Sequence, residues 1–226
     1  LEMRIASLEG ERKSFNKGKR ESEFKLESKT GELRNNTACI HAMTEDWEKF
    51  LAAAKTDKEG KRLNPVRIEG LDSTDEKVIG KRLQEIAKNA ATGGLYTQIG
   101  ELYGFPIKVI SERSVSDGLE FIDNRFVVEG NYKYKYNNGH LAMADTHAAA
   151  TNFLNALEKI PSIIDQYKEK NEVLEREIPQ LQEIAGKVWK KEEELKGLKS
   201  ELAALDRRIQ LEPVSYTHLT LPTKLE

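Results

Sequence analysis

The residues best suited to chemistry form a run of alternating tyrosine and lysine that ends at Tyr136. Its tyrosines are Tyr132, Tyr134 and Tyr136, and its lysines are Lys133 and Lys135. On a β-strand the tyrosines would share one face and the lysines the other, because successive side chains point to opposite sides. Rings can stack on bases and lysines can contact phosphates, so the run is a candidate nucleic-acid platform. The alternative is an ordinary half-buried strand whose lysines face water.

A second candidate is a basic cluster near the start of the chain, in which one acidic residue, Glu11, accompanies five basic residues. The basic residues are Arg12, Lys13, Lys17, Lys19 and Arg20. Such a density of positive charge can follow a phosphate backbone, and the alternative is a solvated, frayed helix. The whole chain has 36 Lys and Arg against 38 Asp and Glu, a net charge of −2. Nucleic acid would therefore be held by local patches and not by bulk charge.

The sequence lacks the motifs of two common nucleotide-dependent activities. Gly80-Lys81 has no glycine five residues earlier and is followed by Arg82, so it does not form a phosphate-binding loop. Asn64-Pro65-Val66 lacks the aromatic residue with which adenine methyltransferases grip a flipped base. We therefore expect no catalytic residues, no bound cofactor and no enzymatic activity in this chain.

The histidines and the cysteine give no stronger signal. His140 and His147 flank Asp145, but turn residues around Gly139 argue against the helix that would align them, so no metal ligands are predicted. The single cysteine, Cys39, cannot form an internal disulfide and is expected to be an inert buried thiol. This cysteine usage is typical of a reducing compartment, and we expect a cytoplasmic location.

Long helices must carry the basic cluster. Apolar residues recur in steps of four and three from Leu1 to Phe50, which predicts a helix of coiled-coil type. Gly18 and several charged seam residues predict a break or fray near Asn16 to Arg20. Asn36 lies at a seam position, where one polar residue can set the register between helices.

Short strands must carry the tyrosine and lysine run. Strand patterns cover Pro65 to Glu69, Leu95 to Leu102, Gly104 to Glu112, Leu119 to Val128 and Tyr132 to Tyr136. The loops between the later strands are too short to cross over a sheet, which predicts an antiparallel arrangement. An amphipathic helix from Glu76 to Ala90, preceded by capping residues, would cover one face.

Helical spacing returns after Asp145, with a seam from Phe153 to Val188 and a second one from Leu195 to Ile209. Pro161 and Pro179 each predict a kink or a break. The predicted fold is therefore α+β: a small antiparallel sheet with one covering helix, inserted between two long helical segments that form an antiparallel coiled-coil stalk. The predicted domains are the N-terminal coiled-coil helix (1–58), the α+β module (59–144), the C-terminal stalk helices (145–212) and a non-native tail (213–226).

Both ends suggest a piece of a larger protein. Leu1 falls within a helical pattern that has no capping residue before it. At the other end, Val214 to Thr223 reads VSYTHLTLPT and resembles the translation of a transposase-end adapter from sequencing libraries. We exclude this tail from the fold prediction as we would a fusion scar.

Three segments carry a family resemblance: GFPIKVI from Gly104 to Ile110, NALEKIP from Asn155 to Pro161, and EEELKGLKSELAAL from Glu192 to Leu205. From about Asn64 to Gln210, the chain resembles the C-terminal accessory region of large Swi/Snf-type helicase and adenine-specific DNA methyltransferase proteins of bacterial mobile elements. The family's motor and methyltransferase motifs lie upstream of this region. The chain departs from the family at Asn152, where a charged residue is expected, so no contact is carried over to that surface.

The resemblance implies a non-catalytic accessory module that positions DNA or braces the motor of a larger bacterial helicase or DNA methyltransferase. Its partners would be DNA, through the parent protein, and the upstream domains of the same polypeptide. The alternative is a structural coiled-coil module for protein–protein interaction, with no nucleic-acid role. No apolar run is long enough to span a membrane. We expect a monomer, since short connections favour pairing of the two helical segments within one chain.

Overall fold

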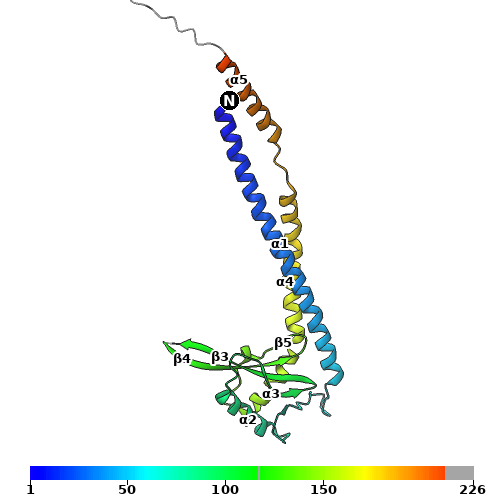
Figure 1. Ribbon diagram of the computed structural model, residues 1–226. Helices are drawn as coiled ribbons and strands as arrows, with labels where there is room; N and C mark the ends of the chain where they lie inside the picture. Colours follow the sequence, from blue (N-terminus) through cyan, green and yellow to red (C-terminus); the bar gives the residue numbers. More distant parts are fainter. Residues whose placement is uncertain (117, 212–226) are drawn as a thin grey trace, which may run out of the picture. The chain divides into compact units, whose positions relative to one another are not determined.

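The structure, a computed structural model, describes residues 1–116 and 118–211. Its elements, in chain order, are α1 (Glu2–Ala53), β1 (Arg67–Ile68), α2 (Glu76–Asn89), β2 (Thr97–Leu102), β3 (Phe105–Ser116), β4 (Leu119–Glu129), β5 (Lys133–Tyr134), a 3₁₀ turn (Asn137–Gly139), α3 (Thr146–Glu158), α4 (Ile160–Gly186) and α5 (Glu192–Leu211). The predicted α+β fold is confirmed: an antiparallel sheet lies in sequence between long helical segments (Figure 1). The tail from Val214 onward lies outside the described residues.

The chain divides into two compact units. Unit 1 contains Leu1–Lys29 and the chain from Arg176, and unit 2 contains Thr30–Glu175. Helices α1 and α4 each contribute residues to both units.

The sheet of unit 2 has the order β1-β2-β3-β4-β5, and every neighbouring pair is antiparallel. β2 and β3 are joined by Tyr103 and Gly104, whose φ angles of 52° and 77° are both left-handed. Two left-handed residues make the tight hairpin turn whose twist matches that of the strands. β3 and β4 then pair along a long ladder that runs from Ile107 opposite Val128 to Ser116 opposite Leu119.

Helices α2 and α3 lie on the same side of this sheet (Figure 1). The carboxylate of Asp75 caps α2 by accepting a hydrogen bond of 2.8 Å from the Lys77 amide. The two helices approach closely at Gly80, where a Cβ atom would collide with the backbone of Thr146. α3 reaches the sheet through Phe153, whose ring centroid lies 6.1 Å from that of Phe126. The first turns of the predicted C-terminal stalk therefore belong to the core around the sheet.

The second half of α1 packs into the same core. Met43 and Phe50 are fully buried, together with Leu157 and Ile160 from the other end of unit 2. The Phe50 ring contacts those of Trp47 and Tyr103, with centroids 5.4 and 5.6 Å away. Further along, Asn36 and Asn171 are buried, and the Asn171 amide donates to Thr37 at 3.5 Å. Rising numbers on α1 meet falling numbers on α4, so the two helices run antiparallel.

Unit 1 is a pair of antiparallel helical segments with a small apolar contact. Ile5, Leu8 and Leu195 are buried, and Trp189, Leu198 and Leu202 pack against them. Ion pairs continue along the same interface: Arg4–Glu194 at 2.7 Å, Arg12–Glu192 at 3.1 Å and Lys29–Glu177 at 2.6 Å.

One of the three predicted helix interruptions needs correction. The break expected near Asn16 to Arg20 is wrong, since α1 is continuous from Glu2 to Ala53. Contacts with the opposite segment support α1 there, including the Lys19 ammonium, which donates to the Lys187 carbonyl at 3.3 Å. At Pro161 the break is confirmed, because α3 ends at Glu158 and α4 begins at Ile160. At Pro179, where a kink or a break was predicted, α4 is not broken and continues to Gly186.

Candidate nucleic-acid interface

The basic cluster of unit 1 presents three of its five side chains to solvent. Lys13, Lys17 and Arg20 follow one another at spacings of four and three on α1, which places them on one helix face. All three are exposed and line a surface hollow of about 640 Å³. We call these three residues the basic face.

The other two predicted residues face the opposite helical segment. The Arg12 guanidinium forms its ion pair with Glu192, and Lys19 is held at the Lys187 carbonyl. Both are partly buried. Their role in this structure is to join the two segments of unit 1, although the contact to a carbonyl leaves the charge of Lys19 unneutralised.

Charge on the basic face is only weakly compensated. Lys17 lies 3.9 Å from Glu21, and both side chains are largely exposed, so this pair contributes little. Lys13 and Arg20 form no ion pair with any residue that the structure describes. Glu9, at the edge of the hollow, is paired with Lys199 at 2.5 Å. The face therefore offers net positive charge to a ligand.

Sequence reasoning missed Phe24, which shares this face. It lies four residues beyond Arg20 and seven beyond Lys17, and its side chain is 74% exposed. Phe24 does not fall on the apolar seam, and this could have indicated from the sequence that its ring is exposed. An exposed ring beside lysine and arginine is the combination that single-strand binding proteins use for bases and phosphates.

The tyrosines of the second candidate are part of the core of unit 2. Tyr134 is fully buried and its hydroxyl donates a hydrogen bond of 2.6 Å to Asp46. Burial, and then the hydrogen bond to Asp46, raise the pKa of the Tyr134 hydroxyl far above its ordinary value. The ring of Tyr132 lies 5.5 Å from that of Tyr134, and its hydroxyl is 3.3 Å from that of Tyr167. The prediction that these rings form a stacking platform is wrong.

Tyr136 is also partly buried, and the Lys159 ammonium lies 4.6 Å from its ring centroid. Alternation did predict which side chains share a face, but the tyrosines take the inner face and the lysines the outer one. The half-buried strand is thus the better description, with β5 itself limited to Lys133 and Tyr134.

Lys133 and Lys135 remain at the surface. The Lys133 ammonium lies 3.3 Å from Glu129 and 5.2 Å from the centroid of Tyr96. Both lysines line a hollow of about 550 Å³ beside Tyr96. Lys133 is partly neutralised by Glu129, which also pairs with Lys108. This pair of lysines is a weaker candidate than the basic face of unit 1.

Asp46 is a buried carboxylate that sequence reasoning did not single out. It is 3% exposed and accepts hydrogen bonds from the backbone amides of Asn131 and Tyr132, each at 3.0 Å, besides the one from Tyr134. Gly130 leaves no room for a side chain beside this carboxylate. Asp46 therefore holds the turn between β4 and β5 against α1. Both of its carboxylate oxygens are used in these hydrogen bonds.

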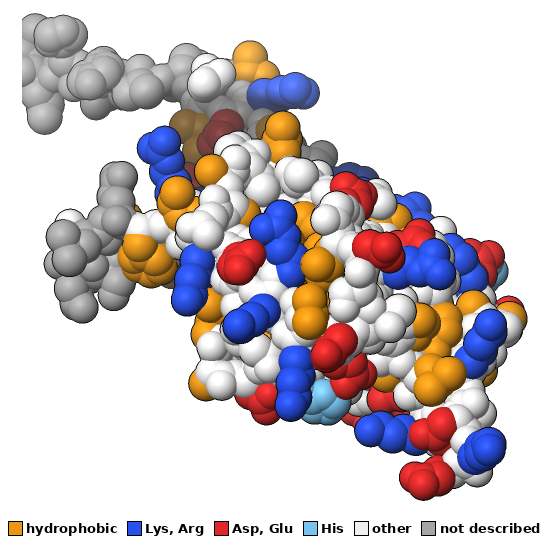
Figure 2. Space-filling model, turned by 90° about the horizontal axis from the view of Figure 1, so that it is seen from below, with side chains coloured by type: hydrophobic (Ala, Val, Ile, Leu, Met, Phe, Trp, Pro, Cys, Tyr) orange, Lys and Arg blue, Asp and Glu red, His pale blue; other side chains and the backbone are white. Residues whose placement is uncertain are grey.

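Other ionisable groups are spread over the surface. On the face shown in Figure 2, Lys and Arg side chains are interspersed with Asp and Glu side chains, so that face has no broad field of one sign. His147 lies 2.6 Å from Glu76, and His140 lies 3.4 Å from Asp123. Within residues 1–116 and 118–211, no three His, Cys, Asp or Glu side chains cluster as metal ligands. Over the same residues, no helix is both long and apolar enough to span a membrane.

Comparison with known families gives one match. Residues 51–157 match the model of a family described as "Domain of unknown function (DUF8438)". The matched range begins at the end of α1 and stops one residue before the end of α3, so it contains the whole sheet with α2 and almost all of α3. No curated protein matches the chain. The similarity therefore concerns the sheet and its covering helices and excludes the basic face.

Proposed function

We propose that this chain is a non-catalytic accessory module that holds nucleic acid for a larger DNA-processing enzyme, a helicase or DNA methyltransferase. The observation that carries the proposal is the basic face of α1, where Lys13, Lys17 and Arg20 are exposed around one hollow. The resemblance in the sheet and C-terminal helices supplies the class of parent enzyme.

The dimensions of the basic face fit a phosphate backbone. Lys13 and Arg20 are seven residues apart on a continuous helix, which is about 10 Å at 1.5 Å per residue. One strand of duplex DNA carries a phosphate about every 3.4 Å along its axis. The face therefore spans about three phosphates. Contacts of this kind position nucleic acid without reading its sequence.

Removing the charge of the basic face tests this proposal. We expect the triple variant Lys13→Gln, Lys17→Gln, Arg20→Gln of the full chain to bind a 20-base-pair duplex at least tenfold more weakly at 50 mM salt. The slope of log affinity against log salt concentration should fall by about 2 to 3, because three phosphate contacts are lost. Fluorescence anisotropy of a labelled duplex measures both quantities.

A matched control removes equal charge from α2, where Lys77, Lys81 and Lys88 are also exposed. The variant with glutamine at these three positions should keep the wild-type affinity and salt slope. If the two triple variants weaken binding equally, binding depends on bulk charge and the basic face is not the contact surface.

A structural module for protein–protein interaction is the second candidate function. It is favoured by the burial of the tyrosines and by exposed apolar side chains in unit 2, among them Leu95, Val115 and Ile122, which are 72%, 68% and 58% exposed. If the wild-type chain binds neither duplex nor single-stranded DNA at micromolar concentration, the nucleic-acid proposal fails and this second function stands.

A further inference from the structure

One edge of β3 lacks a neighbouring strand. β2 pairs with β3 only as far as Thr97 opposite Val109, whereas β3 continues to Ser116 in its ladder with β4. Beyond Val109, the edge of β3 that faces away from β4 is therefore open to another chain. Unpaired backbone groups on such an edge are a template for an added strand.

The backbone groups on this open edge can be identified. The Ser111 amide donates a hydrogen bond of 2.7 Å to the Thr92 hydroxyl, so the Ser111 backbone faces away from β4. In an antiparallel ladder every second residue faces the same edge. The pairing with β4 is regular through this stretch, so the amide and carbonyl groups of Arg113 and Val115 also face the open edge.

A fixed loop lies at one end of the open edge. The Ser111 hydroxyl accepts a hydrogen bond from the Thr92 amide at 2.9 Å and donates one to the Ala90 carbonyl at 3.1 Å. Asn124 donates to the same Ala90 carbonyl at 3.0 Å. These bonds hold the segment that leads into Gly93 and Gly94. The loop is therefore positioned before any ligand binds.

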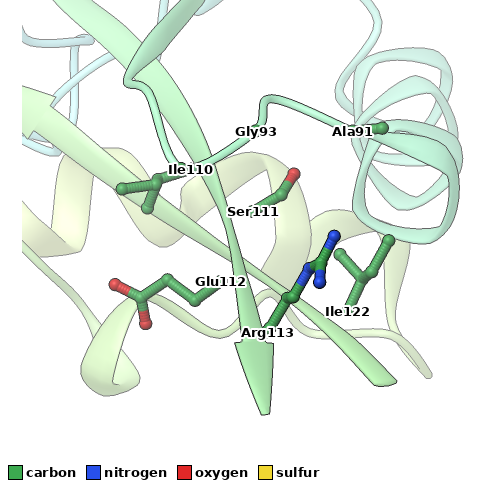
Figure 3. A pocket seen from close by; sticks show the side chains of 8 residues that line it. Ala91, Gly93, Ile110, Ser111, Glu112, Arg113 and Ile122 are labelled. Carbon is green, nitrogen blue, oxygen red and sulfur yellow. The ribbon is translucent and has the colours of Figure 1, made fainter. Parts of the chain in front are cut away.

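The two glycines have φ angles of 62° and 84°, and they line a pocket of about 770 Å³ with Ile110, Arg113 and Ile122 (Figure 3). Within the described part of the chain, neither the Gly93 nor the Gly94 amide donates a hydrogen bond. Successive free amides in a tight loop can capture an anionic group. Side chains at these positions would be strained by the left-handed backbone.

Two charged residues line the pocket, Arg113 and Glu112. Arg113 forms no ion pair with any described residue, and Figure 3 shows it on the same side of the hairpin as Ile122, toward the glycine loop. Glu112 points to the opposite side, where its carboxylate lies 3.6 Å from the Arg125 guanidinium. An anion in the pocket would meet an uncompensated guanidinium beside an apolar wall.

We propose that this pocket and the open edge of β3 bind the C-terminal end of an extended peptide whose last residue is apolar. The terminal carboxylate faces Arg113 and the amides of Gly93 and Gly94, and the last side chain covers Ile122. The peptide backbone pairs with Arg113 and Val115. Since the carboxylate lies at the loop and the peptide leaves toward the hairpin tip, the added strand runs antiparallel to β3.

Several features favour a peptide over a phosphate-bearing ligand. A phosphate would use Arg113 and the loop amides but would leave the open backbone groups of Arg113 and Val115 unpaired. Ile122, 58% exposed, would also stay uncovered. Strand addition combined with capture of a terminal carboxylate uses all of these groups, and both are recurring modes of peptide recognition.

The experiment compares two hexapeptide libraries that end in leucine and have randomised preceding residues, one with a free carboxylate and one with a C-terminal amide. We expect the full chain to select peptides only from the free-carboxylate library. Amidation of a selected peptide, or the variant Arg113→Gln, should weaken binding about tenfold, the loss typical of one charge-assisted contact. Arg82→Gln, an exposed arginine on α2, is the matched control and should leave affinity unchanged.

A second variant tests the backbone pairing. Val115→Pro removes an amide that faces away from β4, and proline is tolerated at such edge positions. It should weaken binding about fivefold to tenfold while preserving the circular dichroism spectrum. If this variant is unfolded, the backbone pairing is tested on the peptide instead, with a series of peptides that are each N-methylated at one residue. Binding should be lost in every second peptide of the series.

Three outcomes would overturn the proposal. The first is equal selection from both libraries, and the second is selection that does not depend on Arg113. The third is displacement of the selected peptide by oligo(dT) in the wild type but not in Arg113→Gln, which would make the pocket a phosphate site.

Discussion

Helix α1 is packed in two different ways along its length. In unit 2 it buries Met43, Asp46 and Phe50 in a core that also includes the sheet and α3. In unit 1 only Ile5 and Leu8 are buried on the same helix, and many of the remaining contacts across the interface are exposed ion pairs. Buried apolar side chains contribute far more than exposed ion pairs. Unit 2 therefore contributes most of the free energy of folding. Unit 1 buries few side chains, and its exposed charged residues can contact a ligand.

Phe50→Ala should be the most damaging single change. The side chain is fully buried between Trp47 and Tyr103, and truncating such an aromatic costs about 3–5 kcal/mol. Urea denaturation followed by near-ultraviolet circular dichroism measures the loss. Trp47 is only partly buried, so its replacement by alanine should cost less.

The exposed Phe24 provides a control for this comparison. Phe24→Ala should change the free energy of unfolding by no more than about 0.5 kcal/mol. Equal effects of the two substitutions would mean that burial does not distinguish the two halves of α1.

Asp46→Ala should cost about 3 kcal/mol, because it leaves the buried Tyr134 hydroxyl and two partly buried backbone amides without an acceptor. Hydrogen exchange should show lost protection at Asn131 and Tyr132. Glu45→Gln is the neighbouring control: this exposed residue accepts from the Asn131 side chain and lies 3.5 Å from His41, but it contacts neither the Tyr134 hydroxyl nor the two amides. If the amides of Asn131 and Tyr132 stay protected from exchange in Asp46→Ala, Asp46 does not hold this turn against α1.

Leu8→Ala should destabilise unit 1 locally, by about 2 kcal/mol at the low end for a buried leucine, because the surrounding apolar cluster is small. Amides of α5 should exchange faster, while those of Phe105 to Val109 in the sheet should not. A uniform increase across both regions would show that the two units unfold together.

The smallest expected effect is that of acidic pH on the stability of unit 1. Hydrogen bonds from Lys199 and Lys191 lower the pKa values of Glu9 and Glu11 below 4.5. A carboxylate whose pKa is lowered by folding stabilises the folded state at pH values above its ordinary pKa. This contribution is lost as the pH falls through the pKa that the group has in the folded state. Pairing within unit 1 should therefore weaken below about pH 4.5.

Carbon NMR of the carboxyl groups reports this titration directly. In Lys199→Gln, the midpoint of Glu9 should rise toward its ordinary value, while that of Glu11 should stay low because its own partner is Lys191. An unchanged Glu9 midpoint would show that the ion pair does not form in solution.

Local patterns were sufficient to predict most of the fold. The predicted helix from Glu76 to Ala90 ends within one residue of α2, because both the capping residue and the apolar face are local signals. The later strands also match in number and order, since glycine and asparagine mark their turns. The second covering helix, α3, was assigned to the stalk, because helical spacing does not reveal which partner a face meets.

The candidate site was predictable only in part. Charge density identified the basic cluster, and helical spacing separates Lys13, Lys17 and Arg20 from Arg12 and Lys19. Alternation grouped the tyrosines correctly but could not show that their face is the buried one. Asp46 gave no local signal at all, because its backbone partners lie 85 and 86 residues away in the chain.

The separation between α1 and its partners also affects how the protein is made. Asn171 contacts Thr37 from 134 residues later in the sequence, and ribosomes add roughly 5 to 20 residues each second. The part of α1 around Thr37 therefore waits for roughly 7 to 27 seconds after its synthesis before Asn171 exists. During that time this part of α1 lacks a partner, and transiently exposed apolar surface favours aggregation. Completion of the core of unit 2 is consequently a late event in the synthesis of this chain.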